Sequence, residues 1–161
     1  MKWRFDDGGR YEALRKRCAG DCVARSVAIA TEIPYGIIHQ WIHDLGVKER
    51  IRKGHRSHPD RGVNKVVYRQ LLRSLGWQWQ PTMGIGTGCR VHLREHELPP
   101  GRLVVEVSRH MCAVVDGIIH DTYDPSRGGT RCVYGYWHKG NEECLAVTSV
   151  TQNSFIAHLS D

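Results

Sequence analysis

Apolar residues at helical spacing dominate the first half of the chain. After Asp21, small and apolar side chains cover nearly every face of a predicted helix, which indicates that this helix is central and buried. Asp21 is a typical N-cap residue, so Cys22 falls in the first turn of the helix. The small and apolar positions are Val23, Val27, Ala28, Ile29 and Ala30.

Two further helices are predicted from apolar stripes. The first begins at Pro34, and Gly46 is expected to end it. The second spans about 62–75 and is followed by Gly76, and the polar residues 47–61 before it predict a loop. The stripes consist of Ile37, Ile38, Trp41, Ile42 and Leu45 in the first helix and Val63, Val67, Leu71 and Leu75 in the second.

Short apolar runs dominate the second half of the chain and predict strands. Asp116-Gly117 separates two of these runs, and this dipeptide is the strongest short-range hairpin signal. Segment 81–101 is rich in Gly and Pro and predicts a long loop, and Trp77 and Trp79 before it share one strand face. The predicted strands cover 103–107, 111–115, 118–123, 132–137 and 145–150.

The order of these elements predicts an α+β fold. Helices come first and antiparallel strands follow, so the helices are expected to pack on the sheet. We expect one domain over residues 1–161, with a helical part at about 12–76 and a sheet part at about 77–158. A chain of 161 residues is long enough for such a domain to have its own core.

Composition and charge indicate which binding partners and which cellular compartment to expect. The net charge of +6 suggests an anionic partner, but the basic residues are spread along the chain as on an ordinary solvated surface. A protein or peptide partner is therefore favoured over nucleic acid. No run approaches the roughly 18 apolar residues of a membrane span, and the charged N-terminus lacks an export signal. We expect a cytoplasmic protein of a bacterium or phage-infected cell, with no membrane partner and six reduced cysteines at positions 18, 22, 89, 112, 132 and 144.

The predicted hairpin brings polar side chains onto one face. Counting from the turn at Asp116-Gly117, His110 and Asp121 are diagonal neighbours, within reach of one another. Cys112 and Tyr123 project to the same side, because side chains alternate along a strand.

These residues are the parts of a cysteine hydrolase. A thiol at a helix N-terminus feels the positive end of the helix dipole, which favours its thiolate, so Cys22 is the candidate nucleophile. His110 is the candidate general base, and Asp121 is the carboxylate expected to orient it. Asp124 is the reserve for the third position, although its dipeptide with Pro125 is typical of a turn.

The chain resembles the papain-like cysteine peptidase superfamily, and most of all its compact microbial and phage members, akin to the peptidase domains that process bacteriocin leaders. The resemblance rests on Asp21-Cys22 opening a helix, on His110 preceding strand 111–115, and on Asp121 in the adjoining strand. It implies a helical subdomain packed on an antiparallel sheet, with the site in the cleft between them. It also implies Cys22 as nucleophile, His110 as base and Asp121 as third member, with no cofactor.

The chain departs from the papain-like pattern at two points. The interval from His110 to the third member is shorter than usual, and Asp124 would lie nearer the usual spacing. Papain-like sites also often carry a Gln a few residues before the cysteine, and Leu14–Cys18 contains none. The oxyanion hole is therefore expected to use the Cys22 backbone N–H with a second donor from elsewhere.

Other readings remain open at this stage. His39 with His43, and His92 with His96, have the i, i+4 spacing of metal ligands, but neither pair has an evident third ligand nearby. Cys18 is a candidate resolving thiol for Cys22.

Two functions fit the whole pattern. The first is a cysteine hydrolase acting on a peptide, isopeptide or other amide bond, with deamidation or acyl transfer as variants of the same chemistry. The alternative is a non-catalytic phage or bacterial binding protein on the same fold, with a basic partner-binding surface.

Overall fold

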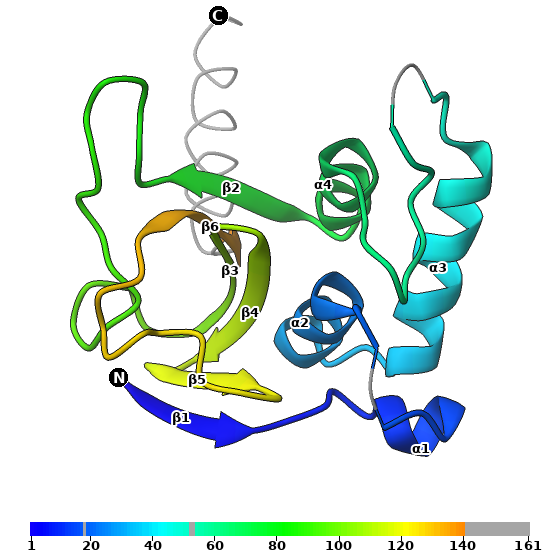
Figure 1. The fold of residues 1–161 in the computed structure, drawn as a ribbon, viewed down its shortest axis with the longest axis horizontal. Coiled ribbons are helices and arrows are strands. Elements are labelled where there is room, and N and C mark those ends of the chain that lie inside the picture. The colour runs from blue at the N-terminus through cyan, green and yellow to red at the C-terminus, as the bar shows by residue number, and fades with distance from the viewer. Residues whose placement is uncertain (18, 52–53, 141–161) are drawn as a thin grey trace, which may run out of the picture.

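The computed structural model of the chain describes residues 1–17, 19–51 and 54–140. These residues form an α+β fold, as predicted, in which N-terminal helices pack on a six-stranded mixed sheet (Figure 1). The helices are α1 (Arg10–Leu14), α2 (Cys22–Thr31), α3 (Tyr35–Lys48) and α4 (Lys65–Ser74). The strands are β1 (Lys2–Phe5), β2 (Trp77–Pro81), β3 (Arg102–Val107), β4 (His110–Val115), β5 (Ile118–Asp121) and β6 (Val133–Lys139).

The sheet has the order β1-β5-β4-β3-β6-β2. Every described pairing is antiparallel except that of β1 with β5, which is parallel. The sheet is therefore mostly, but not wholly, antiparallel.

Two apolar clusters lie on the two faces of the sheet. On β4, Met111 and Ala113 belong to the cluster beneath the helices, whereas Cys112 and Val114 belong to the cluster on the opposite face. Figure 1 shows that the sheet is curved and that the helices lie outside the curve. α2 packs against β4 and is buried along most of its length, which explains why apolar residues occur on nearly all its sides.

The central hairpin has the predicted register. Ala113 pairs with His120 across the two-residue turn. Both turn residues have positive φ, 47° at Asp116 and 77° at Gly117, which is the turn geometry that Asp-Gly favours. The second strand is shorter than the predicted 118–123: β5 ends at Asp121, where the Thr122 N–H turns back onto the Asp121 carboxylate.

Two elements lie where no element was predicted. β1 occupies residues 2–5 and α1 begins at Arg10, both before the predicted helical part at about 12–76. β1 has no local signal in its favour because all four of its residues are exposed and its partner β5 is far away in sequence. The predicted helix over 62–75 is shorter, at Lys65–Ser74.

Of the strands predicted near the C-terminus, one is observed and one is not described. The strand predicted at 132–137 is β6, displaced to Val133–Lys139. The strand predicted at 145–150, together with Cys144, lies outside the described residues. Among the described residues, no helix combines the length and apolar character that crossing a bilayer demands.

Gly46 does not end α3, contrary to the prediction, because it serves a close contact inside the helix. α3 continues to Lys48, and Gly46 is buried. A Cβ at Gly46 would stand 2.4 Å from the backbone oxygen of Ser57. The missing side chain therefore lets the backbone at Ser57 lie directly on the helix.

We expect Gly46→Ala to destabilise the fold by about 1–3 kcal/mol, because the Ser57 backbone must move to admit the methyl group. Gly36 in the same helix is the matched control: a Cβ there would meet only Ala13 at 3.8 Å. Gly36→Ala is expected to gain up to about 1 kcal/mol from the better helix propensity of alanine. Urea unfolding of the two variants checks both signs, and equal effects would contradict the close-contact explanation.

Candidate active site

Cys22 is the first residue of α2, as predicted, but the residue before it does not cap the helix. Asp21 makes no side-chain bond to the N–H groups of the first turn. Its carboxylate instead accepts bonds from Arg10 Nη1 at 3.0 Å, Arg25 Nη1 at 2.5 Å and the Tyr35 hydroxyl at 2.8 Å. The first-turn N–H groups beside the Cys22 thiol are therefore left uncapped by the Asp21 side chain.

His110 and Asp121 meet across the hairpin. Nε2 of His110 lies 2.6 Å from Oδ2 of Asp121. The other oxygen, Oδ1, accepts bonds from Arg25 Nη2 at 2.8 Å and from the Thr122 N–H at 2.6 Å. Burial alone would raise the pKa of Asp121, but its bond with His110 and the charge of Arg25 outweigh burial and hold that pKa below its ordinary value. Asp121 is thus an ionised carboxylate with no exposed surface.

The pKa of the His110 ring responds to both the Asp121 carboxylate and the Cys22 thiol. Burial would lower the pKa of His110, yet the hydrogen bond with Asp121 and the influence of the Cys22 sulfur raise it to about 9. Because Nε2 is bonded to Asp121, Nδ1 is the nitrogen that remains for Cys22. At neutral pH the imidazole is therefore protonated.

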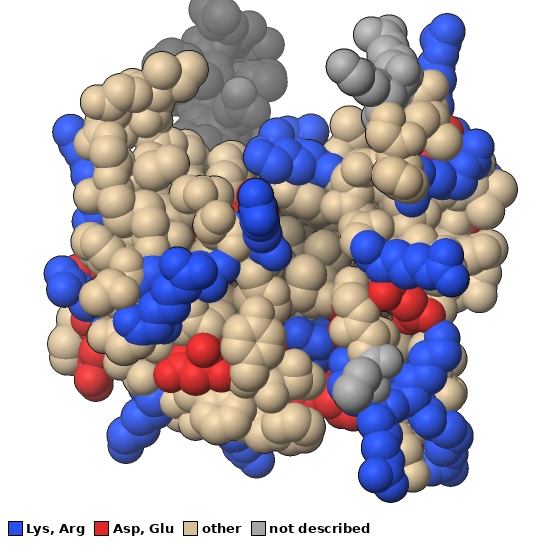
Figure 2. All heavy atoms as spheres, viewed as in Figure 1, with Lys and Arg blue, Asp and Glu red and all other residues tan. Residues whose placement is uncertain are grey.

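Tyr123 covers the His110 ring from the solvent side. The two ring centroids are 5.0 Å apart, and Tyr123 is 49% exposed. Figure 2 shows that the surface is hollowed between the helical half and the sheet half of the molecule, and that Lys and Arg side chains border the hollow. The side chains that flank the His110 region from the sheet half include Arg131, which donates a bond to the Ser108 carbonyl.

Two other side chains from the hairpin region have ordinary structural roles. The Asp124 carboxylate accepts the Ser126 N–H at 2.9 Å and closes its own turn, which leaves Asp121 as the partner of His110. Cys112 is fully buried, and burial raises the pKa of its thiol. A neutral buried thiol is a packing group.

The two histidine pairs are held by separate carboxylates. His39 lies 3.0 Å from Asp60, whereas His43 faces its neighbour Asp44. His92 lies 3.2 Å from Glu97, and His96 is almost fully exposed. In residues 1–17, 19–51 and 54–140, no three His, Cys, Asp or Glu side chains gather as a metal site requires.

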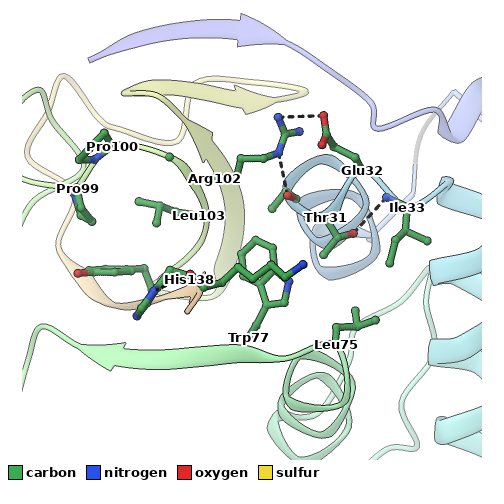
Figure 3. A pocket seen from close by; sticks show the side chains of 14 residues that line it. Thr31, Glu32, Ile33, Leu75, Trp77, Pro99, Pro100, Arg102, Leu103 and His138 are labelled. Atoms are coloured by element: carbon green, nitrogen blue, oxygen red, sulfur yellow. Dashed lines mark hydrogen bonds and ion pairs between the residues drawn. The ribbon is translucent and has the colours of Figure 1, made fainter. Parts of the chain in front are cut away.

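A well-defined cavity lies away from the three candidate residues. It measures about 920 Å³ and is lined by the last residues of α2 and by Trp77, Arg102 and His138 (Figure 3). Cys22 is at the other end of this ten-residue helix, about 14 Å along its axis. The cavity therefore does not belong to the Cys22 site.

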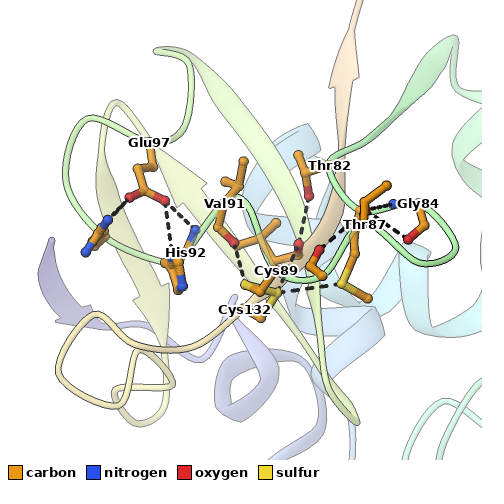
Figure 4. Close-up of a disulfide and its surroundings, with 12 residues drawn as sticks. Thr82, Gly84, Thr87, Cys89, Val91, His92, Glu97 and Cys132 are labelled. Atoms are coloured by element: carbon orange, nitrogen blue, oxygen red, sulfur yellow. Dashed lines mark hydrogen bonds and ion pairs between the residues drawn. A yellow bond between two sulfur atoms is a disulfide. The ribbon is translucent and has the colours of Figure 1, made fainter.

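The prediction that all six cysteines are reduced is wrong for two of them. Cys89 and Cys132 form a disulfide (Figure 4), because the 82–101 loop folds back along β6 and brings their Cα atoms within 5.8 Å. The pairing joins positions 43 residues apart and has no local sequence signal. Cys22 and Cys112 are free thiols, and Cys18 and Cys144 lie outside the described residues.

Arg25 is the member of this site that sequence reasoning missed. It lies on α2 and contacts both Asp21 and Asp121, with 4% of its surface exposed. The available signal was a charged residue within the mostly apolar run 23–30. A buried arginine needs carboxylate partners, so its position alone pointed to a polar network.

Comparison with known proteins adds no family assignment: no family model, curated protein or solved structure matches the chain. The chemistry of the site therefore rests on its own geometry.

Proposed function

We propose that the protein is a cysteine hydrolase with a papain-like arrangement of Cys22, His110 and Asp121. One observation carries the proposal: the His110 ring is hydrogen-bonded to the buried Asp121 carboxylate, and the Cys22 thiol at the start of α2 is among the causes of its raised pKa. A nucleophile, a base and an orienting group in this order are the parts that thiol catalysis requires. An isolated structural histidine needs no such pair of partners.

The proposed reaction begins from the Cys22 thiolate and the His110 imidazolium. The sulfur attacks the carbonyl carbon of an amide, a C–S bond forms, and the carbonyl electron pair moves to oxygen. The Cys22 backbone N–H, at the positive end of α2, donates to that oxyanion. As the C–N bond breaks, the leaving nitrogen takes a proton from Nδ1 of His110. Water then gives a proton back to Nδ1 and attacks the thioester, which releases the acid and restores the thiolate.

A protein or peptide is the proposed substrate class. The same steps cleave a peptide bond or an isopeptide bond, and they deamidate a side-chain amide when ammonia is the leaving group. If an amine replaces water in the second half, the result is acyl transfer. None of these steps uses a cofactor.

We expect limited iodoacetamide at pH 6.5 to label Cys22 before any other cysteine. Cys112 is the internal control, because it is a free thiol that is buried and held neutral by its raised pKa. Cys89 and Cys132 are protected by their disulfide as long as no reductant is present. Peptide mapping by mass spectrometry locates the adduct, and first labelling of Cys18 or Cys112 would contradict the assignment.

A peptidyl acyl probe tests the catalytic step itself. The wild type should form an adduct on Cys22, and Cys22→Ser and His110→Gln should form none while remaining folded. A wild-type protein that is alkylated at Cys22 but never acylated would favour the non-catalytic binding protein instead.

A further inference from the structure

We propose that Arg25 is a positioning residue that joins the nucleophile helix to the base-bearing hairpin and shares the charge of Asp121. This inference rests on the proposed function, since it assigns a role to a residue that touches no reacting atom. It assigns Arg25 to the control of His110 rather than to the packing of α2.

The Arg25 guanidinium bridges two carboxylates. One guanidinium nitrogen, Nη1, donates to Asp21 at 2.5 Å, and the other, Nη2, donates to Asp121 at 2.8 Å. Asp21 directly precedes the Cys22 helix, and Asp121 ends β5. Arg25 therefore spans the helical half and the sheet half at the level of the site. A planar fork suits such a bridge, whereas an ammonium group is a single point charge.

The two carboxylate oxygens of Asp121 have different partners. Arg25 and the Thr122 N–H occupy Oδ1, which leaves Oδ2 for His110. The carboxylate is therefore held from two sides before it meets the imidazole. This arrangement sets which oxygen faces the ring and in which plane it lies.

Arg25 belongs to a connected series of ion pairs. Arg10, Asp21, Arg25, Asp121 and His110 form one chain of contacts in which positive and negative groups alternate. Asp21 is also held by the Tyr35 hydroxyl. Buried charges persist when each has partners of opposite sign, and this explains why Asp21 binds two arginines rather than capping α2.

The consequence concerns the proton on His110. Asp121 stabilises the imidazolium, and a carboxylate with no second partner would bind that proton more tightly. The positively charged Arg25 pairs with the same carboxylate and repels the positive charge of the imidazolium. Arg25 thereby keeps the His110 proton available for the leaving nitrogen.

The experiment follows the His110 ring by NMR during a pH titration, with His110→Gln to assign its resonance. Arg25→Met should raise the titration midpoint of His110 by about one unit, because a positive charge near the ring is lost. It should also slow acylation of Cys22 by a peptidyl probe tenfold or more. Arg25→Lys keeps the charge, so the midpoint should stay within a few tenths of a unit. Acylation should still slow, because one ammonium cannot make both fork bonds.

Arg102→Met is the matched control. Arg102 also ties α2 to the sheet, but at the opposite end of the helix (Figure 3). Its Nε and Nη2 donate to the carbonyls of Ala30 and Ile29 at 2.9 and 2.5 Å. Its loss should lower the melting temperature and leave the His110 midpoint unchanged.

An unchanged or lowered midpoint in folded Arg25→Met would overturn the inference. If that variant does not fold, full-rate acylation in Arg25→Lys overturns the positioning role. A different result would overturn the proposed function alone: the wild type forms no acyl adduct, although the His110 midpoint differs between the wild type and Arg25→Met.

Discussion

Asp121→Asn is expected to lower the rate of acyl transfer by about 10⁴-fold, whereas Asp124→Asn leaves it near the wild-type rate. The amide at position 121 has lost the negative charge that stabilises the imidazolium. Its NH₂ group can also donate to Nε2 of His110, which leaves the single ring proton on Nδ1 and favours the neutral imidazole over the imidazolium from which the proposed reaction begins. An asparagine at 124 can still accept the Ser126 N–H, so that turn survives.

Steady-state or single-turnover kinetics on any amide or ester probe checks this pair, with urea unfolding to confirm that both variants fold. If Asp124→Asn abolishes activity and Asp121→Asn does not, the third member has been assigned to the wrong residue. If neither variant changes any acyl-transfer activity, the three residues are not catalytic, and the binding-protein alternative gains ground.

The hairpin could be predicted residue by residue because its signals are local. A two-residue turn leaves one register, and alternation along the strands then determines which side chains share a face. Both the pairing of Ala113 with His120 and the contact of His110 with Asp121 follow from counting outward from Asp116-Gly117.

The features that sequence reasoning missed depend on distant partners. β1 pairs with β5 across more than a hundred residues, and the disulfide depends on how the 82–101 loop returns to β6. The sequence predicts that Gly46 ends a helix, whereas in the structure Gly46 allows a close contact with Ser57. Long-range packing decided each of these features, and no short window of residues contains that information.

Arg25 and Asp21 show the same limit within the site. An aspartate before a helix predicts a cap, and that prediction placed Cys22 correctly although the cap bond is absent. The Asp21 carboxylate pairs with two buried arginines instead of capping the helix, because an unpaired buried charge costs more free energy than an uncapped helix end. Local propensity located Cys22 at the start of α2, and the tertiary network decided how its neighbours bond.

The protonation of His110 should make the fold more stable at pH 6 than at pH 9.5 by about 3 kcal/mol. The folded pKa of about 9 lies above the value of 6.5 that an unfolded histidine has. A raised pKa means that the folded state holds the proton more tightly than the unfolded state does. The contribution is therefore complete below pH 6.5, declines as the pH rises through 9, and is absent above it. The side chain is only 8% exposed, so solvent screens the interaction weakly.

Urea unfolding at a series of pH values measures this contribution, and His110→Gln isolates it. Lysines and tyrosines also titrate near the upper end of the range, but they do so equally in the variant. The difference in unfolding free energy between wild type and His110→Gln should thus shrink by about 3 kcal/mol from pH 6 to pH 9.5. Parallel curves for the two proteins would mean that the Asp121 carboxylate and the Cys22 sulfur do not stabilise an imidazolium in the folded state. The resting site would then contain a neutral thiol and a neutral imidazole, and His110 would have to remove the thiol proton during the attack itself.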